Sequence, residues 1–289
     1  AEEMYVRALK GYEKAWGHVH PSTLDTLNNL GNLYKNQARL QEAEEMYVRA
    51  LEGKEKAKAW GRWHPSTLDT VNNLGLLYAD QGRLQKAEEM YKRALEGKEN
   101  AWGEEHPSTL DTVNNLGNLF KTQGRVQEAE EMYVRALKGY EKAWGQWHPS
   151  TLGTVNNLGN LYADQGRFQE AETEYKRALE GYEMTLGPTS VLTYIPALVT
   201  LENLGLLSEK QGTIEKALFY YRLALNGAGA VWGRNDNRYK ELSSILSSLS
   251  PDTCDFFEVQ ESIRVGKTRP EENWGKKIKA KLSVMFRPR

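Results

Sequence analysis

The sequence is poor in the features that mark disulfide-stabilised, membrane-spanning or strongly charged proteins. Its 289 residues include one cysteine, Cys254, so no intramolecular disulfide can form and we expect a reducing, cytoplasmic location. No apolar run approaches the roughly 18 residues of a transmembrane helix. The net charge is −1, which gives no overall attraction to nucleic acid or to an anionic membrane. We therefore expect no nucleic-acid partner, and we do not expect a membrane partner.

What the sequence does contain is an internal repeat of 42 to 44 residues. Between residues 106–147 and residues 148–189, 28 of 42 positions are identical. A more divergent unit is centred on residues 201–205. In such an array each unit buries its apolar face against its neighbours, so no single globular core is needed. The pentapeptide His-Pro-Ser-Thr-Leu marks the repeats and begins at four histidines, His20, His64, His106 and His148.

Each repeat is predicted to form two antiparallel helices. The first begins at a proline such as Pro21, because proline suits the first helical position. The second carries Glu-Ala-Glu-Glu-Met-Tyr and ends near Ala-Trp-Gly. Between the two helices, the small residues Gly31 and Ala43 allow a close approach, and Tyr34 and Tyr47 fill the remaining gap. The first helix is expected to end at a glycine in the left-handed conformation, namely Gly82, Gly124, Gly166 or Gly212.

This spacing of small and large residues resembles the tetratricopeptide repeat. The 42-residue period, the His-Pro start and the Leu/Val-Asn-Asn-Leu-Gly core are similar to the kinesin light chain subtype. The near-identity of the repeats is similar to the arrays in the C-terminal regions of fungal NOD-like receptors. The resemblance implies an all-α, right-handed α-solenoid of helix hairpins with a C-terminal helical cap. It also implies a protein or peptide ligand in a concave groove that the first helices line.

We divide the chain into three parts. Residues 1–17 match only the second helix of a repeat, residues 18–232 form five repeats of about 42 residues, and residues 233–289 are atypical. The last part predicts helices over 236–249, 250–265 and 270–286. Its final segment alternates lysines with apolar residues along one helical face. This basic segment either caps the last repeat or binds an anionic membrane or an acidic partner.

A recurring asparagine is the main candidate for ligand binding. It lies on the face of the first helix opposite the core, and its amide can both donate to and accept from the backbone of an extended peptide. In the resembled family this position contacts peptide backbone. The alternative is a hydrogen bond between repeats that only orders the solenoid. The five residues are Asn29, Asn73, Asn115, Asn157 and Asn203.

Other positions on the same face vary between otherwise similar repeats. Asn32, Asn118 and Asn160 alternate with leucines, and Asp80 and Asp164 replace Asn36. With Asp25, Asp69 and Asp111, these aspartates predict an acidic groove, which favours a neutral or basic segment. These asparagines and the two aspartates complete the predicted site.

Motifs for catalysis, cofactors and metals are missing. Gly266-Lys267-Thr268 ends like a phosphate-binding loop, but Glu261 stands where the earlier glycine is required. The recurring histidines would lie about 10 Å apart in stacked helices, too far to share a zinc ion, and are better explained as helix-start residues. We predict that the protein is not an enzyme and has no catalytic residue, cofactor or metal site.

The predicted function is ligand sensing by the C-terminal region of a fungal NOD-like receptor. A cargo or scaffold adaptor similar to kinesin light chain is the alternative, and a homotypic assembly surface is a third possibility. The sequence does not identify the ligand.

Overall fold

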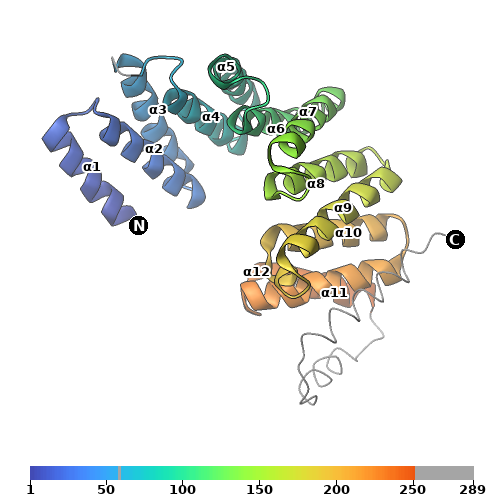
Figure 1. Cartoon of the computed structure of the whole chain (residues 1–289). Coiled ribbons are helices and arrows are strands. Elements are labelled where there is room, and N and C mark those ends of the chain that lie inside the picture. Colours follow the sequence, from blue (N-terminus) through green and yellow to red (C-terminus); the bar gives the residue numbers. More distant parts are fainter. Residues whose placement is uncertain (58–59, 251–289) are drawn as a thin grey trace. The chain divides into compact units, whose positions relative to one another are not determined.

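The computed structural model describes residues 1–57 and 60–250, and all regular structure in these residues is helical. The chain divides into two compact units, residues 1–145 and residues 146–289, and each is described by itself. Figure 1 shows the helices in chain order. The second and third helical segments predicted for the C-terminal part lie outside the described residues.

The first unit contains three helix hairpins preceded by one helix. The hairpins are α2 with α3, α4 with α5, and α6 with α7, and each packs on the next. We call α2, α4 and α6 the A helices and their partners the B helices. The bounds are α1 Glu2–Trp16, α2 Pro21–Asn36, α3 Leu40–Lys56, α4 Pro65–Asp80, α5 Leu84–Trp102, α6 Pro107–Thr122 and α7 Val126–Trp144.

The second unit continues the pattern with two hairpins and a final helix. Here α8 and α10 are A helices, α9 and α11 are B helices, and α12 packs on α11. A short 3-10 helix, η1, precedes α10 in place of the His-Pro start. The bounds are α8 Pro149–Asp164, α9 Phe168–Leu186, η1 Ser190–Thr193, α10 Ile195–Lys210, α11 Ile214–Val231 and α12 Asn237–Leu249.

The His-Pro pair starts the A helices, as the sequence predicts. His64 is the N-cap of α4, and its Nδ1 accepts a hydrogen bond of 3.2 Å from the backbone N–H of Ser66. Trp60, four residues before His64, stacks on the imidazole with ring centroids 5.5 Å apart. His20, His106 and His148 cap their helices in the same way. The recurring histidines are therefore explained by helix capping.

Each hairpin closes where an A-helix glycine faces a B-helix tyrosine. A Cβ placed on Gly31 would lie 2.6 Å from the ring of Tyr47. Tyr47 and Ala43 are fully buried, and Tyr34 is nearly so, which confirms their predicted place between the helices. The same contact joins Gly75 with Tyr91, Gly117 with Tyr133, Gly159 with Tyr175 and Gly205 with Tyr221.

Helix α3 ends earlier than its sequence pattern predicts. The corresponding helices end at Trp102 and Trp144, but α3 ends at Lys56, before Trp60 and Gly61. This repeat carries two extra residues, which would turn a continuous helix by about 200° and place Trp60 on the wrong face. Ending the helix at Lys56 lets Trp60 stack on His64, as Trp16 does on His20 and Trp102 on His106.

The turn between α2 and α3 contains an alanine in the left-handed conformation. Ala38 has φ 58°, and its counterparts Gly82, Gly124 and Gly166 have φ 71°, 74° and 73°. An L-residue is strained there by about 1–2 kcal/mol. Ala38→Gly also gives the unfolded chain more freedom, at a cost of about 0.4–1 kcal/mol. We expect a net stabilisation of about 0.5–1 kcal/mol, seen as slower amide hydrogen exchange in residues 21–57. Faster exchange there would contradict it, and Gly82→Ala should have the opposite effect.

Candidate peptide-binding surface

The predicted asparagine ladder lies on the A helices and joins successive repeats. The Nδ2 of Asn73 donates to Oδ1 of Asn28 at 3.2 Å, and that of Asn115 donates to Oδ1 of Asn72 at 3.3 Å. In the second unit Asn203 donates to Oδ1 of Asn160 at 2.9 Å. Asn29 is exposed on α2, and Asn157 is half-buried on α8. In Asn73 and Asn115 one amide N–H is thus used between repeats, and an asparagine amide has a second N–H and a carbonyl oxygen that can bind a ligand.

A second asparagine position anchors the core tyrosines. Asn32 accepts a hydrogen bond of 2.6 Å from the hydroxyl of the buried Tyr47, which gives this buried polar group a partner. Asn118 does the same for Tyr133 and Asn160 for Tyr175, both at 2.7 Å. These predicted site residues therefore have a structural partner within their own hairpin.

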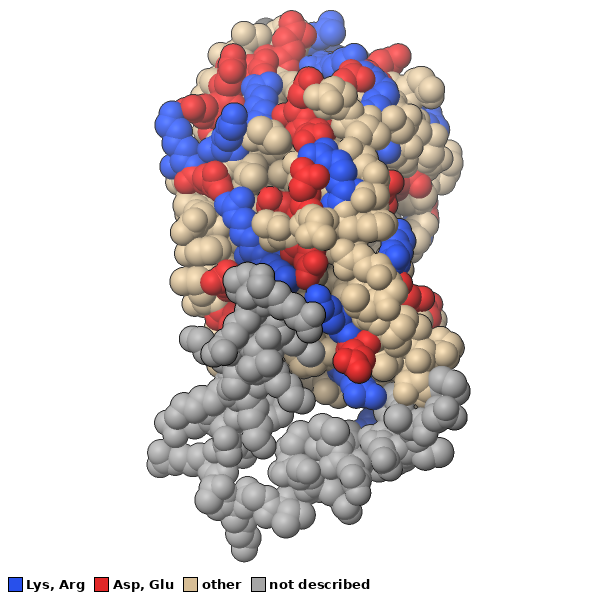
Figure 2. Space-filling model, turned by 90° about the vertical axis from the view of Figure 1, so that its right-hand side faces the viewer, with Lys and Arg blue, Asp and Glu red and all other residues tan. Residues whose placement is uncertain are grey.

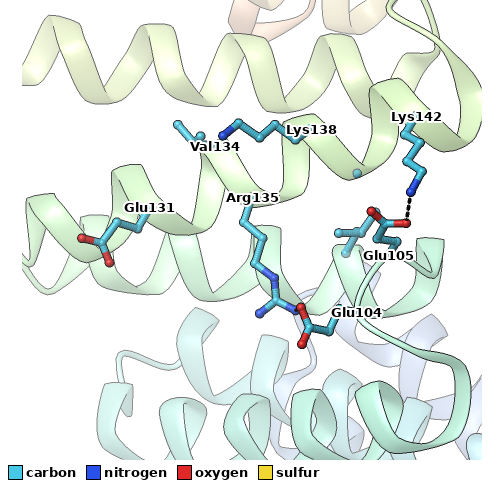
Figure 3. A pocket seen from close by; sticks show the side chains of 9 residues that line it. Glu104, Glu105, Glu131, Val134, Arg135, Lys138 and Lys142 are labelled. Carbon is cyan, nitrogen blue, oxygen red and sulfur yellow. Dashed lines mark hydrogen bonds and ion pairs between the residues drawn. The ribbon is translucent and has the colours of Figure 1, made fainter.

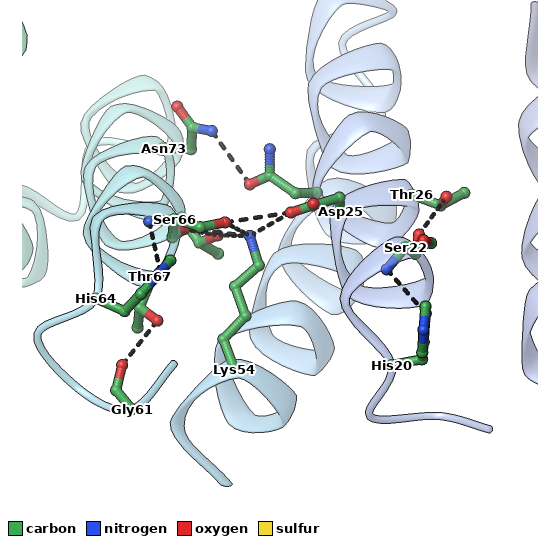
Figure 4. A network of polar contacts seen from close by, with 12 residues as sticks. His20, Ser22, Asp25, Thr26, Lys54, Gly61, His64, Ser66, Thr67 and Asn73 are labelled. Carbon is green, nitrogen blue, oxygen red and sulfur yellow. Dashed lines mark hydrogen bonds and ion pairs between the residues drawn. The ribbon is translucent and has the colours of Figure 1, made fainter. Parts of the chain in front are cut away.

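Two buried lysines, which the sequence pattern did not predict, lie beneath this surface. Lys54 and Lys98 come from B helices, and each is 2% exposed. The Nζ of Lys54 lies 3.0 Å from Oδ1 of Asp25 and 2.7 Å from Oγ of Ser66 (Figure 4). Lys98 lies 3.0 Å from Asp69. Comparing the repeats with one another would have drawn attention to this position, because the later repeats have Tyr140 and Tyr182 where the first two have lysine.

The aspartates of the predicted acidic groove have partners in the chain. Asp25 and Asp69 pair with the buried lysines, and Asp80 pairs with Lys35 at 3.3 Å. Asp111 accepts a hydrogen bond from the hydroxyl of Tyr140. Burial, and then this hydrogen bond, raise the pKa of Tyr140. The A-helix surface of the first unit is therefore less negative than its aspartates alone suggest. Asp164, which occupies on α8 the position of Asp80 on α4, is also exposed.

Charges elsewhere are paired across repeats in a regular way. Arg83 stacks on Tyr78 at 4.3 Å and contacts Glu44 of the preceding hairpin at 2.7 Å. Arg125 repeats this with Phe120 and Glu88. On the face that Figure 2 shows, basic and acidic side chains lie next to each other.

Two leucines add apolar surface between the asparagines. Leu206 on α10 is 48% exposed, and Leu76 on α4 is half-buried. Both stand where other repeats have Asn32, Asn118 or Asn160. Within either unit, a ligand on the A helices would therefore meet amides, carboxylates and an isolated apolar side chain.

Within residues 1–57 and 60–250, no three His, Cys, Asp or Glu side chains gather closely enough to hold a metal ion. None of the helices in the described part of the chain combines the length and apolar content that crossing a membrane requires.

Comparison with known proteins identifies the family. The tetratricopeptide repeat profile matches residues 1–56, 66–142 and 150–230. The chain belongs to the tetratricopeptide repeat family. Members of this family are generally protein-binding and typically act as non-catalytic scaffolds. The search of curated proteins found no match.

Solved structures support the same fold for these tetratricopeptide repeats. BtubC (BKLC) from P. vanneervenii is 23% identical, with a TM-score of 0.66 over 79% of this chain and 90% of that one. A P. anserina putative kinesin light chain with nearly identical TPR-like repeats is 26% identical, with a TM-score of 0.54 over 64% of this chain and 86% of that one. PilF from Pseudomonas aeruginosa is 18% identical, with a TM-score of 0.52 over 83% and 97%.

Proposed function

We propose that the A-helix surface binds an extended protein segment, with the asparagine ladder holding its backbone. The observation that carries this proposal is the ladder itself: an amide recurs in successive A helices, and only one of its N–H groups is used between repeats in Asn73 and Asn115. An asparagine amide can pair with both the N–H and the C=O of a peptide unit. The remaining amide groups of Asn73 and Asn115 suit such pairing, and Asp80 and Asp164 favour a neutral or basic segment over an acidic one.

The inter-repeat bonds suggest a test that separates ligand contact from scaffold order. Twelve-residue peptides selected by display on the whole chain provide the ligand. Asn115→Ala should weaken binding by about 0.5–1.5 kcal/mol, because it removes backbone contacts as well as the bond to Asn72. Asn72→Ala breaks the same inter-repeat bond, together with the bond from the Thr112 hydroxyl, and leaves the Asn115 amide in place. It should weaken binding less. Isothermal titration calorimetry measures both.

Two further comparisons decide whether the ladder contacts the peptide. Equal losses in the two variants would mean that the ladder only orders the repeats. Glu89→Ala, an exposed change on the B helix α5, should leave the affinity unchanged. Affinity that falls with rising salt would support a basic segment, whereas no salt dependence would point to a neutral one.

We further propose that the parent protein is a receptor of the fungal NOD-like type and that this array senses its ligand. The support is the near-identity of the repeats together with their variation at A-helix positions such as the exposed Asp80 and the half-buried Leu76. The full-length coding sequence tests this directly. A nucleotide-binding domain upstream would support the receptor, and a heptad coiled coil there would support an adaptor.

The adaptor alternative has an observation of its own. The P. anserina structure, which has similar repeats, bears the name of a putative kinesin light chain. In an adaptor, the same A-helix surface would hold a cargo protein continuously. The ligand-binding test above applies to both alternatives, so the upstream domain alone decides between them.

A further inference from the structure

The third repeat has an open pocket on its B-helix side, away from the asparagine ladder. The pocket has a volume of about 550 Å³ and lies between the turn before α6 and the helix α7. Leu110, Val134 and Gly139 are the uncharged residues that line it. Figure 3 shows the charged side chains at its rim, with Lys142 paired to Glu105.

In two sister repeats a tryptophan occupies the equivalent place. The ring of Trp63 lies 3.0 Å from where a Cβ on Gly97 would stand, and the ring of Trp147 lies 2.8 Å from that position on Gly181. Each tryptophan immediately precedes the capping histidine. In the third repeat that position is Glu105, and the three atoms nearest to a Cβ on Gly139 all belong to Leu110. The third repeat therefore has a pocket at the place where the second and fourth repeats have a tryptophan ring.

The rim of this pocket also differs from its sister sites. Lys138 and Lys142 stand where the second repeat has Glu96 and Asn100. Ammonium groups beside an aromatic ring are attracted to its face, most strongly for tryptophan. The side chains of both Lys142 and Glu105 are exposed, so opening their ion pair costs little free energy. The carboxylate of Glu105 is then available to accept a hydrogen bond from an indole N–H, which can only donate.

We propose that this pocket binds the indole side chain of a tryptophan that a partner protein presents. The indole packs on Leu110 and Gly139, as Trp63 packs in the second repeat. Lys138 and Lys142 lie against its faces. This surface is separate from the A helices, so its role stands or falls independently of the asparagine ladder.

The test uses the full chain and a defined probe, acetyl-Gly-Gly-Trp-Gly-Gly-amide. The readout is the NMR shift of the Leu110 and Val134 methyl groups during titration. We expect saturable shifts with the native chain and with Glu105→Ala, which opens the rim. Glu105→Trp supplies an internal indole and should weaken binding at least tenfold. The same peptide with leucine in place of tryptophan should also bind at least tenfold more weakly.

Several results would overturn the proposal. They are an absence of shifts in the native chain at millimolar probe, equal binding of the tryptophan and leucine peptides, or full binding to a folded Glu105→Trp. If Glu105→Trp does not fold, the comparison of the two peptides on the native chain still decides. Sedimentation provides one more check. Self-association that Glu105→Trp abolishes would assign the indole to a second copy of this chain instead of a partner.

Discussion

Gly117→Ala should destabilise the first unit by about 3 kcal/mol, because overpacking a rigid contact costs about 1–3 kcal/mol or somewhat more. The added methyl would lie 2.7 Å from the ring of Tyr133. That ring cannot give way easily, since it is fully buried and its hydroxyl is held by Asn118 at 2.7 Å. Helices α6 and α7 would have to separate. The midpoint of urea unfolding, followed by circular dichroism, measures the effect.

Gly153→Ala is the matched control for this change. Gly153 also lies inside an A helix, α8, but a Cβ there meets no atom within 4 Å. Alanine should therefore stabilise the helix by about 0.5–1 kcal/mol, as it does at unconstrained helical sites. A loss of similar size in Gly153→Ala would show that the contact with Tyr133 does not determine the cost at Gly117.

Most of the fold could be predicted because the repeat presents each signal several times. The His-Pro start of α2, α4, α6 and α8, the glycine after α4, α6, α8 and α10, and the glycine–tyrosine contact all occur where the sequence places them. The end of α3 could not be predicted in the same way. Its two extra residues break the register, and the response depends on keeping Trp60 against His64. That is a tertiary contact, which a local pattern does not contain.

Less of the candidate site could be predicted from the sequence. The face that carries Asn73 and Asn115 follows from helical periodicity, but their partners Asn28 and Asn72 belong to the preceding repeat. Such bonds depend on how hairpins stack. The ion pair between Asp25 and Lys54 could not be predicted either. A lysine near the end of a B helix is expected to be exposed, whereas Lys54 is buried. Charge along the sequence therefore overstated the acidity of the surface.

Asp25→Ala tests this buried pair and should cost about 2 kcal/mol. Lys54 would keep its bonds to Ser66 and Thr70 but lose its ion-pair partner. A fully buried pair would cost more, but the side chain of Asp25 is 54% exposed, so solvent screens part of the loss. Asp111→Ala is the matched control. Its partner is the neutral hydroxyl of Tyr140, and the expected loss is about 1 kcal/mol.

The pH dependence of the same variant gives a second, independent measurement. Burial lowers the pKa of Lys54 from its ordinary value of 10.5, and Asp25 raises it part of the way back. Asp25→Ala should therefore lower it further. A base whose pKa is lower in the folded chain binds its proton more tightly when unfolded, so stability rises with pH between the folded pKa and 10.5. The deficit of Asp25→Ala should shrink as the pH rises from about 8 to about 10, while that of Asp111→Ala, measured by the same unfolding curves, should not follow it. A constant deficit for Asp25→Ala over this interval would show that Lys54 stays equally protonated without its carboxylate.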